Sequence, residues 1–187
     1  MRATVLAVIL AGAAVIIAAR PALAQDEGKT KASELANASK TALNQLYAKA
    51  PLAKTLGPTA YAILVFPKIK KAGLGIGGQY GEGTLLMNGK AAAYYKTTGA
   101  SYGLQIGGQQ YGYAMFFMNA KALENLDNAN GFEVGVGPSV VMVDEGMAKT
   151  TTTNTLKDDI YAFVFAQKGL MAGLGLQGNK IAKITPK

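Results

Sequence analysis

The sequence predicts an α+β fold, in which a strongly curved antiparallel β-sheet or barrel rich in glycine carries an N-terminal amphipathic helix and a short second helix. Two observations favour this fold. The phrase GLGIGGQ at residues 73–79 recurs as GLQIGGQ at residues 103–109. Glycine in a strand usually marks a close backbone approach, a bulge or a sharp bend. Strands at close, regular spacing with Gly and Asn turns are typical of antiparallel barrels and sandwiches.

The N-terminal segment has the pattern of a signal peptide. Met1-Arg2 is a short positive start, residues 3–19 are uncharged and apolar, and the ending Ala22-x-Ala24 suits signal peptidase. An uncleaved membrane anchor is the alternative, because about seventeen apolar residues nearly span a bilayer. We expect three parts: a signal peptide cleaved after residue 24 (1–24), a flexible N-terminus (25–28) and one domain (29–187).

Composition excludes several kinds of chemistry. The chain has no cysteine and no histidine, which removes disulfides, thiol nucleophiles and the commonest general base and metal ligand. The formal charge of +8 falls to +6 without Arg2 and Arg20, and the remaining cations are all lysines. Lysine suits diffuse attraction to an anionic surface, whereas shaped phosphate recognition usually needs arginine. For an exported protein we therefore expect lipid head groups, not nucleic acid, as the polyanionic partner.

Residues 29–50 are predicted to form the amphipathic helix. Apolar residues recur there at steps of three and four, and polar residues occupy the opposite side. Pro51 ends the helix, because the residue before a proline disfavours helical geometry. The apolar stripe is thin and rich in alanine. Such a helix either docks against the domain or inserts into a bilayer interface, and one helix could do both in different states.

The remainder of the domain is predicted to consist mainly of strands. A buried strand at 60–66 precedes a loop at 67–71 that carries three lysines. Asn88-Gly89 predicts a tight hairpin turn, and Asn119 is the expected cap of a short helix over 120–126. Further strands are expected at 84–88, 90–96, 100–106, 110–118, 132–143, 160–167, 170–176 and 179–184, with a loop and edge strand at 144–155.

No motif predicts an enzyme. Residues 73–78 and 173–178 both match the spacing of a dinucleotide-binding loop, but strand or turn residues follow where that loop needs a helix. The serines lack a histidine partner, and the acid pairs at 144–145 and 158–159 are adjacent carboxylates with no metal-ligand spacing. We therefore expect no catalytic residue, no metal site and no cofactor.

The candidate binding residues are lysines and apolar helix residues. Each basic residue near an anionic bilayer contributes about 1 kcal/mol, so three lysines are weak alone but useful beside an inserted helix. A solvated loop that aids solubility is the alternative reading of the lysine cluster. The predicted lipid-binding residues are Lys29, Lys31, Leu35, Lys40, Leu43, Leu46, Tyr47, Lys68, Lys70 and Lys71.

An ordered set of phrases resembles the SYLF domain family, a lipid-binding module, over about residues 29–184. These phrases lie at residues 66–83, 101–109, 116–123, 131–138 and 161–178. The resemblance implies phospholipid binding with an N-terminal amphipathic segment taking part, here residues 29–50, and secondarily Lys68, Lys70 and Lys71. Bacterial members are typically exported, so actin binding is not carried over.

We therefore expect a non-enzymatic domain of the periplasm or envelope that binds anionic phospholipid surfaces through the amphipathic helix and the lysine-rich loop. The alternative is an envelope scaffold or protein-interaction domain without direct lipid binding. A third possibility, a carrier for a hydrophobic small molecule, needs a cavity inside the barrel. Salt-sensitive binding to anionic vesicles distinguishes the first hypothesis from the second.

Overall fold

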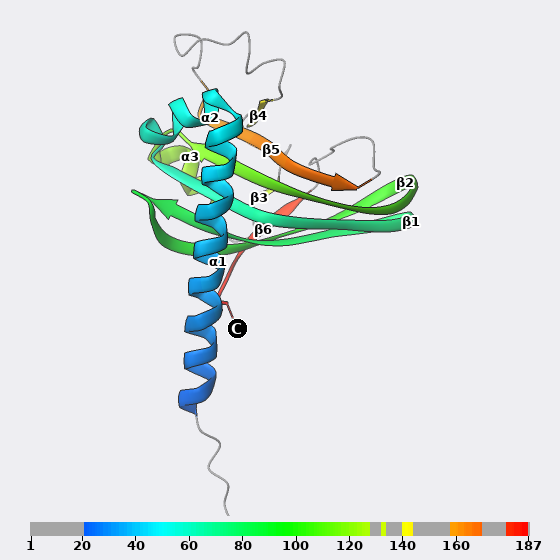
Figure 1. Cartoon of the computed structure of the whole chain (residues 1–187), viewed down its shortest axis with the longest axis horizontal. Coiled ribbons are helices and arrows are strands. Elements are labelled where there is room, and N and C mark those ends of the chain that lie inside the picture. The colour runs from blue at the N-terminus through cyan, green and yellow to red at the C-terminus, as the bar shows by residue number, and fades with distance from the viewer. Residues whose placement is uncertain (1–20, 128–131, 134–139, 144–157, 170–178, 187) are drawn as a thin grey trace, which may run out of the picture.

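The computed structural model describes residues 21–127, 132–133, 140–143, 158–169 and 179–186 (Figure 1). Of residues 21–30, 74–76, 101–107, 127, 132–133, 140–143 and 169 it describes the backbone alone. In chain order the elements are α1 (Pro21–Lys49), α2 (Pro51–Leu56), a 3-10 turn (Gly57–Thr59), β1 (Ala62–Met87), β2 (Lys90–Phe117), α3 (Ala120–Glu124), a second 3-10 turn (Asn125–Asp127), β3 (Phe132–Glu133), β4 (Val140–Val143), β5 (Ile160–Gly169) and β6 (Lys180–Ile184).

The six described strands form one sheet around the long strand β2. β1 pairs with β2 in antiparallel register from Ala62↔Phe117 to Met87↔Lys90. On the other side of β2, β6 pairs with its first part and β5 with its last part, also antiparallel. The short strand β4 adds to β5 in parallel, and β3 adds to β6. The α+β class and the antiparallel sheet are confirmed, with β4–β5 as the parallel exception.

The six described strands do not close into a ring, so the barrel alternative is not supported. Among the described strands β1 pairs only with β2, and β3 and β4 end the path β3-β6-β2-β5-β4. A barrel needs its first and last strands to hydrogen-bond to each other. The predicted strong curvature is present, but it bends the sheet over on itself without joining its edges.

β1 and β2 together form a two-stranded ribbon that is folded double. Both strands run to one end of the molecule and return from it (Figure 1). Returning residues therefore meet earlier residues of the same strand: a Cβ added at Gly83 would lie 2.5 Å from the Val65 carbonyl oxygen. At Gly81 the added atom would lie 2.9 Å from the Lys68 carbonyl oxygen. The bend thus lies between residues 69 and 81, the segment that contains the first glycine phrase.

The other end of the ribbon is the tight turn that the sequence predicted. Asn88 and Gly89 both have positive φ, 50° and 72°. Two consecutive residues of this kind form the hairpin turn whose twist matches that of the flanking strands. The hairpin at Asn88-Gly89 is confirmed.

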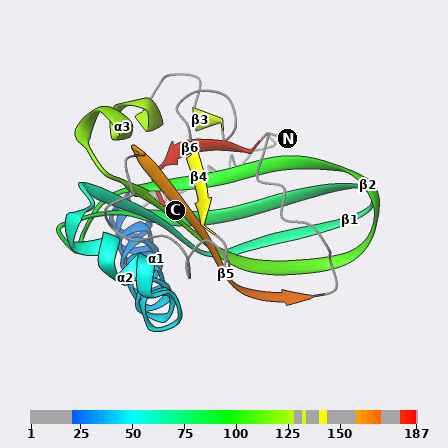
Figure 2. The same ribbon diagram turned by 90° about the horizontal axis from the view of Figure 1, so that it is seen from above.

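Two hydrophobic cores lie on opposite faces of the folded ribbon. Figure 2 shows α1 and α2 on one side of this ribbon and α3 on the other. The inner core lies between the two legs of the ribbon, includes Phe66, Ile69, Tyr95 and Ile181, and is closed at one side by α3. The outer core joins α1 and α2 to the sheet through residues such as Leu46, Phe116 and Phe163. Because side chains alternate along a strand, Leu64 belongs to the inner core and Val65 to the outer one.

The helix boundaries differ in part from the prediction. α1 begins at Pro21, so residues 25–28 are helical and continuous with the predicted helix. It ends at Lys49, and Pro51 starts a second short helix, α2, that was not predicted. Proline is tolerated at a first helical position, where its missing N–H leaves no bond unmade. Asn119 caps α3 as predicted, since its side-chain oxygen accepts a hydrogen bond from the Ala122 N–H at 2.8 Å.

Several predicted strands differ from the observed ones. The separate strands expected within residues 60–118 are two continuous strands, and the predicted loop at 67–71 is part of β1. Within residues 132–143 only β3 and β4 are described. The predicted strand at 170–176 and the loop and edge strand at 144–155 lie outside the described residues. Among the described helices, none has the length and hydropathy needed to cross a membrane.

Candidate functional site

Helix α1 is docked on the outer face of the sheet. Leu43 and Leu46 are 8% and 2% exposed and pack in the outer core, whereas Leu35 and Tyr47 are half-buried. The Tyr47 and Phe116 ring centroids lie 6.4 Å apart. Of the two alternatives predicted for this helix, docking on the domain and insertion into a bilayer, the structure therefore contains the docked one. In this state Leu43 and Leu46 cannot reach a membrane.

One serine of α1 contacts both legs of the folded ribbon. The fully buried Ser39 hydroxyl donates to the Val65 carbonyl oxygen at 3.2 Å and lies 3.1 Å from the Thr84 hydroxyl oxygen. A small side chain is needed here, because the helix crosses close to two backbone segments. The alanine-rich stripe of the sequence thus marks close helix–sheet packing.

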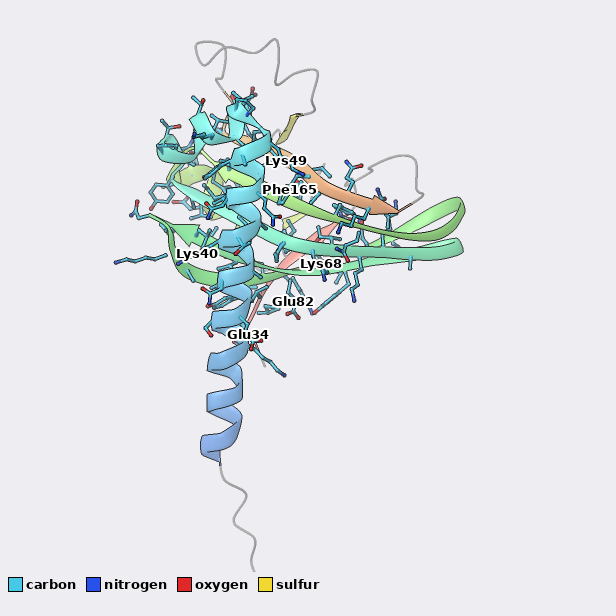
Figure 3. All side chains as sticks on the ribbon, viewed as in Figure 1. Glu34, Lys40, Lys49, Lys68, Glu82 and Phe165 are labelled. Carbon is cyan, nitrogen blue, oxygen red and sulfur yellow. The ribbon has the colours of Figure 1, made fainter. Side chains whose placement is uncertain are left out.

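Four of the predicted lysines are exposed on this outer side: Lys31 and Lys40 on α1, and Lys68 and Lys70 on β1. Figure 3 shows Lys68 on the sheet beside the helix that carries Lys40 and Lys49. Lys29 belongs to α1, but its side chain lies outside the described part of the chain. Lys49 and Lys54 are also exposed on α1 and α2, and were not among the predicted residues. We call Lys31, Lys40, Lys68 and Lys70 the outer lysines.

Lys71 does not belong with Lys68 and Lys70. It lies two residues after the inner-core residue Ile69, and its Cα partner across the ribbon is the buried Gln109. Lys71 is 5% exposed and faces the space between the two legs. The prediction of a lysine-rich loop was therefore wrong in two respects. These residues form part of a strand, and the alternation of side chains along that strand directs Lys71 to the face opposite Lys68 and Lys70.

An inner polar cluster lies between the legs of the ribbon, and one of its members, Gln109, is the Cα partner of Lys71. The Tyr111 hydroxyl donates to Gln79 Oε1 at 2.7 Å, and the Gln79 amide donates to the Asn179 side-chain oxygen. Burial raises the pKa of Tyr111 to about 12. Three buried atoms of this cluster have no hydrogen-bond partner among the described residues: Gln109 Oε1, the Tyr113 hydroxyl and Asn179 Nδ2.

A groove lies between α1 and the returning leg of the ribbon. Its volume is about 520 Å³, and it is lined by Lys31, Glu34, Leu35, Ala38, Tyr80, Glu82, Lys96, Ile184, Thr185 and Pro186. Tyr80 is 48% exposed, and its hydroxyl donates to the Glu82 carboxylate. That hydrogen bond raises the pKa of Tyr80, with burial and the charge of Glu82 as smaller causes. We call this feature the α1 groove.

Of the residues that line the α1 groove, only Lys31 and Leu35 were among the predicted lipid-binding residues. The walls of the groove come from α1, β1, β2, the last residue of β6 and the two residues after it, so no local motif contains them. Within the described residues no group of three acidic side chains is placed to hold a metal ion. The lining of the α1 groove offers charged side chains, an exposed aromatic ring and apolar surface.

Comparison with known families gives one match. Residues 98–185 match the family model described as Ysc84, a Las17-binding protein and actin regulator. This range includes most of β2 together with α3 and β3 to β6. No curated protein matches the chain significantly. The Ysc84 (SYLF) domain family is therefore the family that residues 98–185 resemble, and the resemblance that the ordered phrases of the sequence predicted is confirmed over this part of the chain.

Proposed function

We propose that this domain binds anionic phospholipid membrane surfaces in the cell envelope and catalyses no reaction. The match of residues 98–185 to the Ysc84 (SYLF) domain family supports a binding role. The observation that carries the proposal is the group of outer lysines, which are exposed on and beside one helix. None of the four forms an ion pair with another described residue, so their charge is available to an external anion.

The strength of this attraction follows from the number of charges. Each lysine near an anionic surface contributes about 1 kcal/mol, so the four outer lysines contribute about 4 kcal/mol. That corresponds to a dissociation constant of about 1 mM. Binding through these lysines is therefore weak, reversible and sensitive to salt, since charges at an exposed surface are screened within about 10 Å at 0.1 M salt.

Insertion of the helix is a second and separate step in this proposal. Leu43 and Leu46 are buried against the sheet, and burial of one such side chain contributes about 1.5–3 kcal/mol. The helix must leave the outer core before these leucines enter a bilayer, and the bilayer then has to replace the contacts that were lost. The docked domain is expected to adsorb first through its lysines. Leu35 and Tyr47 are only half-buried, so they can contact the bilayer with the least loss of packing.

Export to the periplasm or envelope is part of the proposal. The signal-peptide pattern of residues 1–24 supports it. Cleavage after Ala24 leaves Gln25 as the first residue, so the docked part of α1, from Ala36 to Leu46, stays in the mature protein. The mass of the protein recovered from the cell envelope tests this directly. A mass that includes residues 1–24 would show that the segment is retained as an anchor.

Charge reversal at one exposed position tests the membrane proposal. Lys68→Glu removes an outer lysine, whereas Lys121→Glu makes the same charge change on α3, which packs against the inner core. We expect Lys68→Glu to reduce co-sedimentation with anionic vesicles by about an order of magnitude, because one attractive contact becomes repulsive. Lys121→Glu should have a smaller effect. Equal effects would show that total charge, and not this face, controls binding.

A protein partner is the second candidate function. The family description names Las17 binding, and β1 pairs with β2 alone among the described strands, so no described strand covers its other edge. A free strand edge accepts an added strand from another chain. A partner bound in this way would be retained at high salt in a pull-down, and vesicles would not compete with it.

A further inference from the structure

The α1 groove carries charged side chains of both signs that form no ion pair with one another among the described residues. It contains Lys31 and Lys96 together with Glu34 and Glu82. No ion pair joins any two of these four side chains in the described structure, although Glu82 and Lys96 are direct cross-strand partners. Such unpaired opposite charges around one groove are complementary to a ligand that carries both a cation and an anion.

The acidic residues form one part of the lining. Glu34 on α1 and Glu82 on β1 lie near each other at the same level of the helix (Figure 3). Tyr80 is next to Glu82 on the same face of the strand, with nearly half of its surface exposed. Carboxylates beside an exposed aromatic ring attract an ammonium group through charge and through the face of the ring.

The rest of the lining suits an anionic group and a hydrocarbon chain. Lys31 and Lys96 supply ammonium groups for phosphate oxygens. Leu35, Ala38, Ile184 and Pro186 supply apolar surface from α1 and the C-terminal segment. A volume of about 520 Å³ falls within the range of small-ligand sites.

We propose that the α1 groove binds the zwitterionic head group of a phospholipid, with its ammonium at Glu34, Glu82 and Tyr80 and its phosphate at Lys31 and Lys96. This inference rests on the proposed membrane function and adds lipid selectivity to it. The outer lysines hold the domain at an anionic surface, and the groove takes up an individual zwitterionic lipid there. The same chemistry occurs in a free head-group ester, so the groove has two potential ligand sources.

Two measurements on the full domain separate these sources. Titration with soluble glycerophosphoethanolamine, followed by NMR shifts of residues that line the groove, tests the free head group. Sedimentation with vesicles of fixed anionic content tests the lipid, when the remaining lipid is either phosphatidylethanolamine or an uncharged glycolipid. We expect about fivefold tighter binding to vesicles that contain the zwitterion. Saturable shifts with the soluble ester and no vesicle preference would overturn the lipid assignment.

Glu82→Gln tests the role of the groove in that preference. The substitution removes the charge but keeps an oxygen that accepts from Tyr80, and Glu124→Gln on α3 is the matched control at an exposed acid. We expect Glu82→Gln to abolish the fivefold preference while the thermal midpoint stays unchanged and the binding to anionic glycolipid vesicles does not fall. Glu124→Gln should retain the preference.

Two outcomes separate the inference from the proposed function. If the wild-type domain binds anionic vesicles equally with either neutral lipid, the proposed function stands and the zwitterion site is wrong. If it binds no vesicles and shows no shifts with the soluble ester, both are wrong. Retention of the preference in Glu82→Gln would also contradict the site.

Discussion

The hydroxyl oxygen of Ser39 lies 3.1 Å from that of Thr84 and 3.2 Å from the carbonyl oxygen of Val65. Val65 is on the outgoing leg of β1 and Thr84 is on the returning leg, so one helix residue connects both ends of a doubled strand. All three residues are buried. Docking of α1 and folding of the ribbon are therefore coupled through this contact.

Ser39→Ala is expected to destabilise the domain by about 1–2 kcal/mol. The substitution removes the hydrogen bond to Val65 and leaves the buried Thr84 hydroxyl without this neighbour, and unmade buried hydrogen bonds cost this much. Asn37→Ala, at an exposed position of the same helix, is the control. Urea unfolding of both variants provides the measurement. Equal stability of the two variants would remove Ser39 from the account of docking.

Gly83→Ala is expected to destabilise the fold more strongly, by about 2 kcal/mol or more. An added Cβ would lie 2.5 Å from the Val65 carbonyl oxygen and 2.6 Å from Phe66 Cδ1, so the two legs must separate. At Gly78 the nearest atom would be the Gly99 carbonyl oxygen at 3.8 Å. Gly78→Ala should therefore cost much less. A thermal midpoint for Gly83→Ala that matches Gly78→Ala would contradict the folded-ribbon geometry.

The two inner tyrosines are expected to respond in opposite directions to loss of the hydroxyl group. Tyr113→Phe removes a buried hydroxyl that has no partner in the described structure, so stability should stay the same or rise by up to about 1 kcal/mol. Tyr111→Phe breaks the bond to Gln79 and leaves a buried acceptor unpaired. It should cost about 1–3 kcal/mol. Chemical denaturation measures the two changes in the free energy of unfolding. A loss of stability in Tyr113→Phe would show that the Tyr113 hydroxyl makes a hydrogen bond in the folded protein.

Alkaline pH is expected to destabilise the domain. Burial raises the pKa of Tyr111 from the ordinary tyrosine value of 10.0 to about 12, and it also raises the pKa of Tyr113. Below pH 10 both phenols are protonated in the folded and unfolded chains, so their contribution is fully present. As pH rises from 10 towards 12 the unfolded chain loses protons that the folded chain keeps, and stability falls by up to about 1.4 kcal/mol per pH unit for each tyrosine.

The slope of stability against pH is the corresponding measurement. Urea titrations between pH 9.5 and 11.5 should show a shallower decline for Tyr113→Phe than for the wild type, because one of the two groups no longer titrates. Lysines also titrate in this pH range, but both proteins contain the same lysines, so their contribution cancels in the difference between the two slopes. Identical slopes would indicate that Tyr113 ionises as readily in the folded protein as in the unfolded one.

Local signals in the sequence predicted local structure well. Asn88-Gly89, the Asn119 cap and the end of the first helix before Pro51 each depend on a few adjacent residues, and all three are present. The glycine phrase predicted a bend, and the legs on either side of it do fold together. The curvature of the sheet was thus predictable. Closure of its edges was not predictable, because strand pairing depends on residues that are distant in sequence.

The position of the lysines was harder to predict. Pro67 and three lysines suggested a loop, but Pro67 lies where the ribbon register shifts between Phe66 and Ile69. A bulge accommodates the missing proline N–H and lets the strand continue. The composition of residues 67–71 does not reveal this register shift. The position of Lys71 on the inner face could therefore not be predicted from composition. The α1 groove was unpredictable for a related reason, since four elements that are distant in sequence form it.

Sedimentation of the wild-type domain with vesicles at two salt concentrations tests the central claim most directly. We expect binding to anionic vesicles at low salt, loss of most of that binding at 0.5 M salt, and little binding to purely neutral vesicles at either concentration. Binding to neutral vesicles as strong as to anionic ones, or no binding to anionic vesicles at low salt, would contradict it.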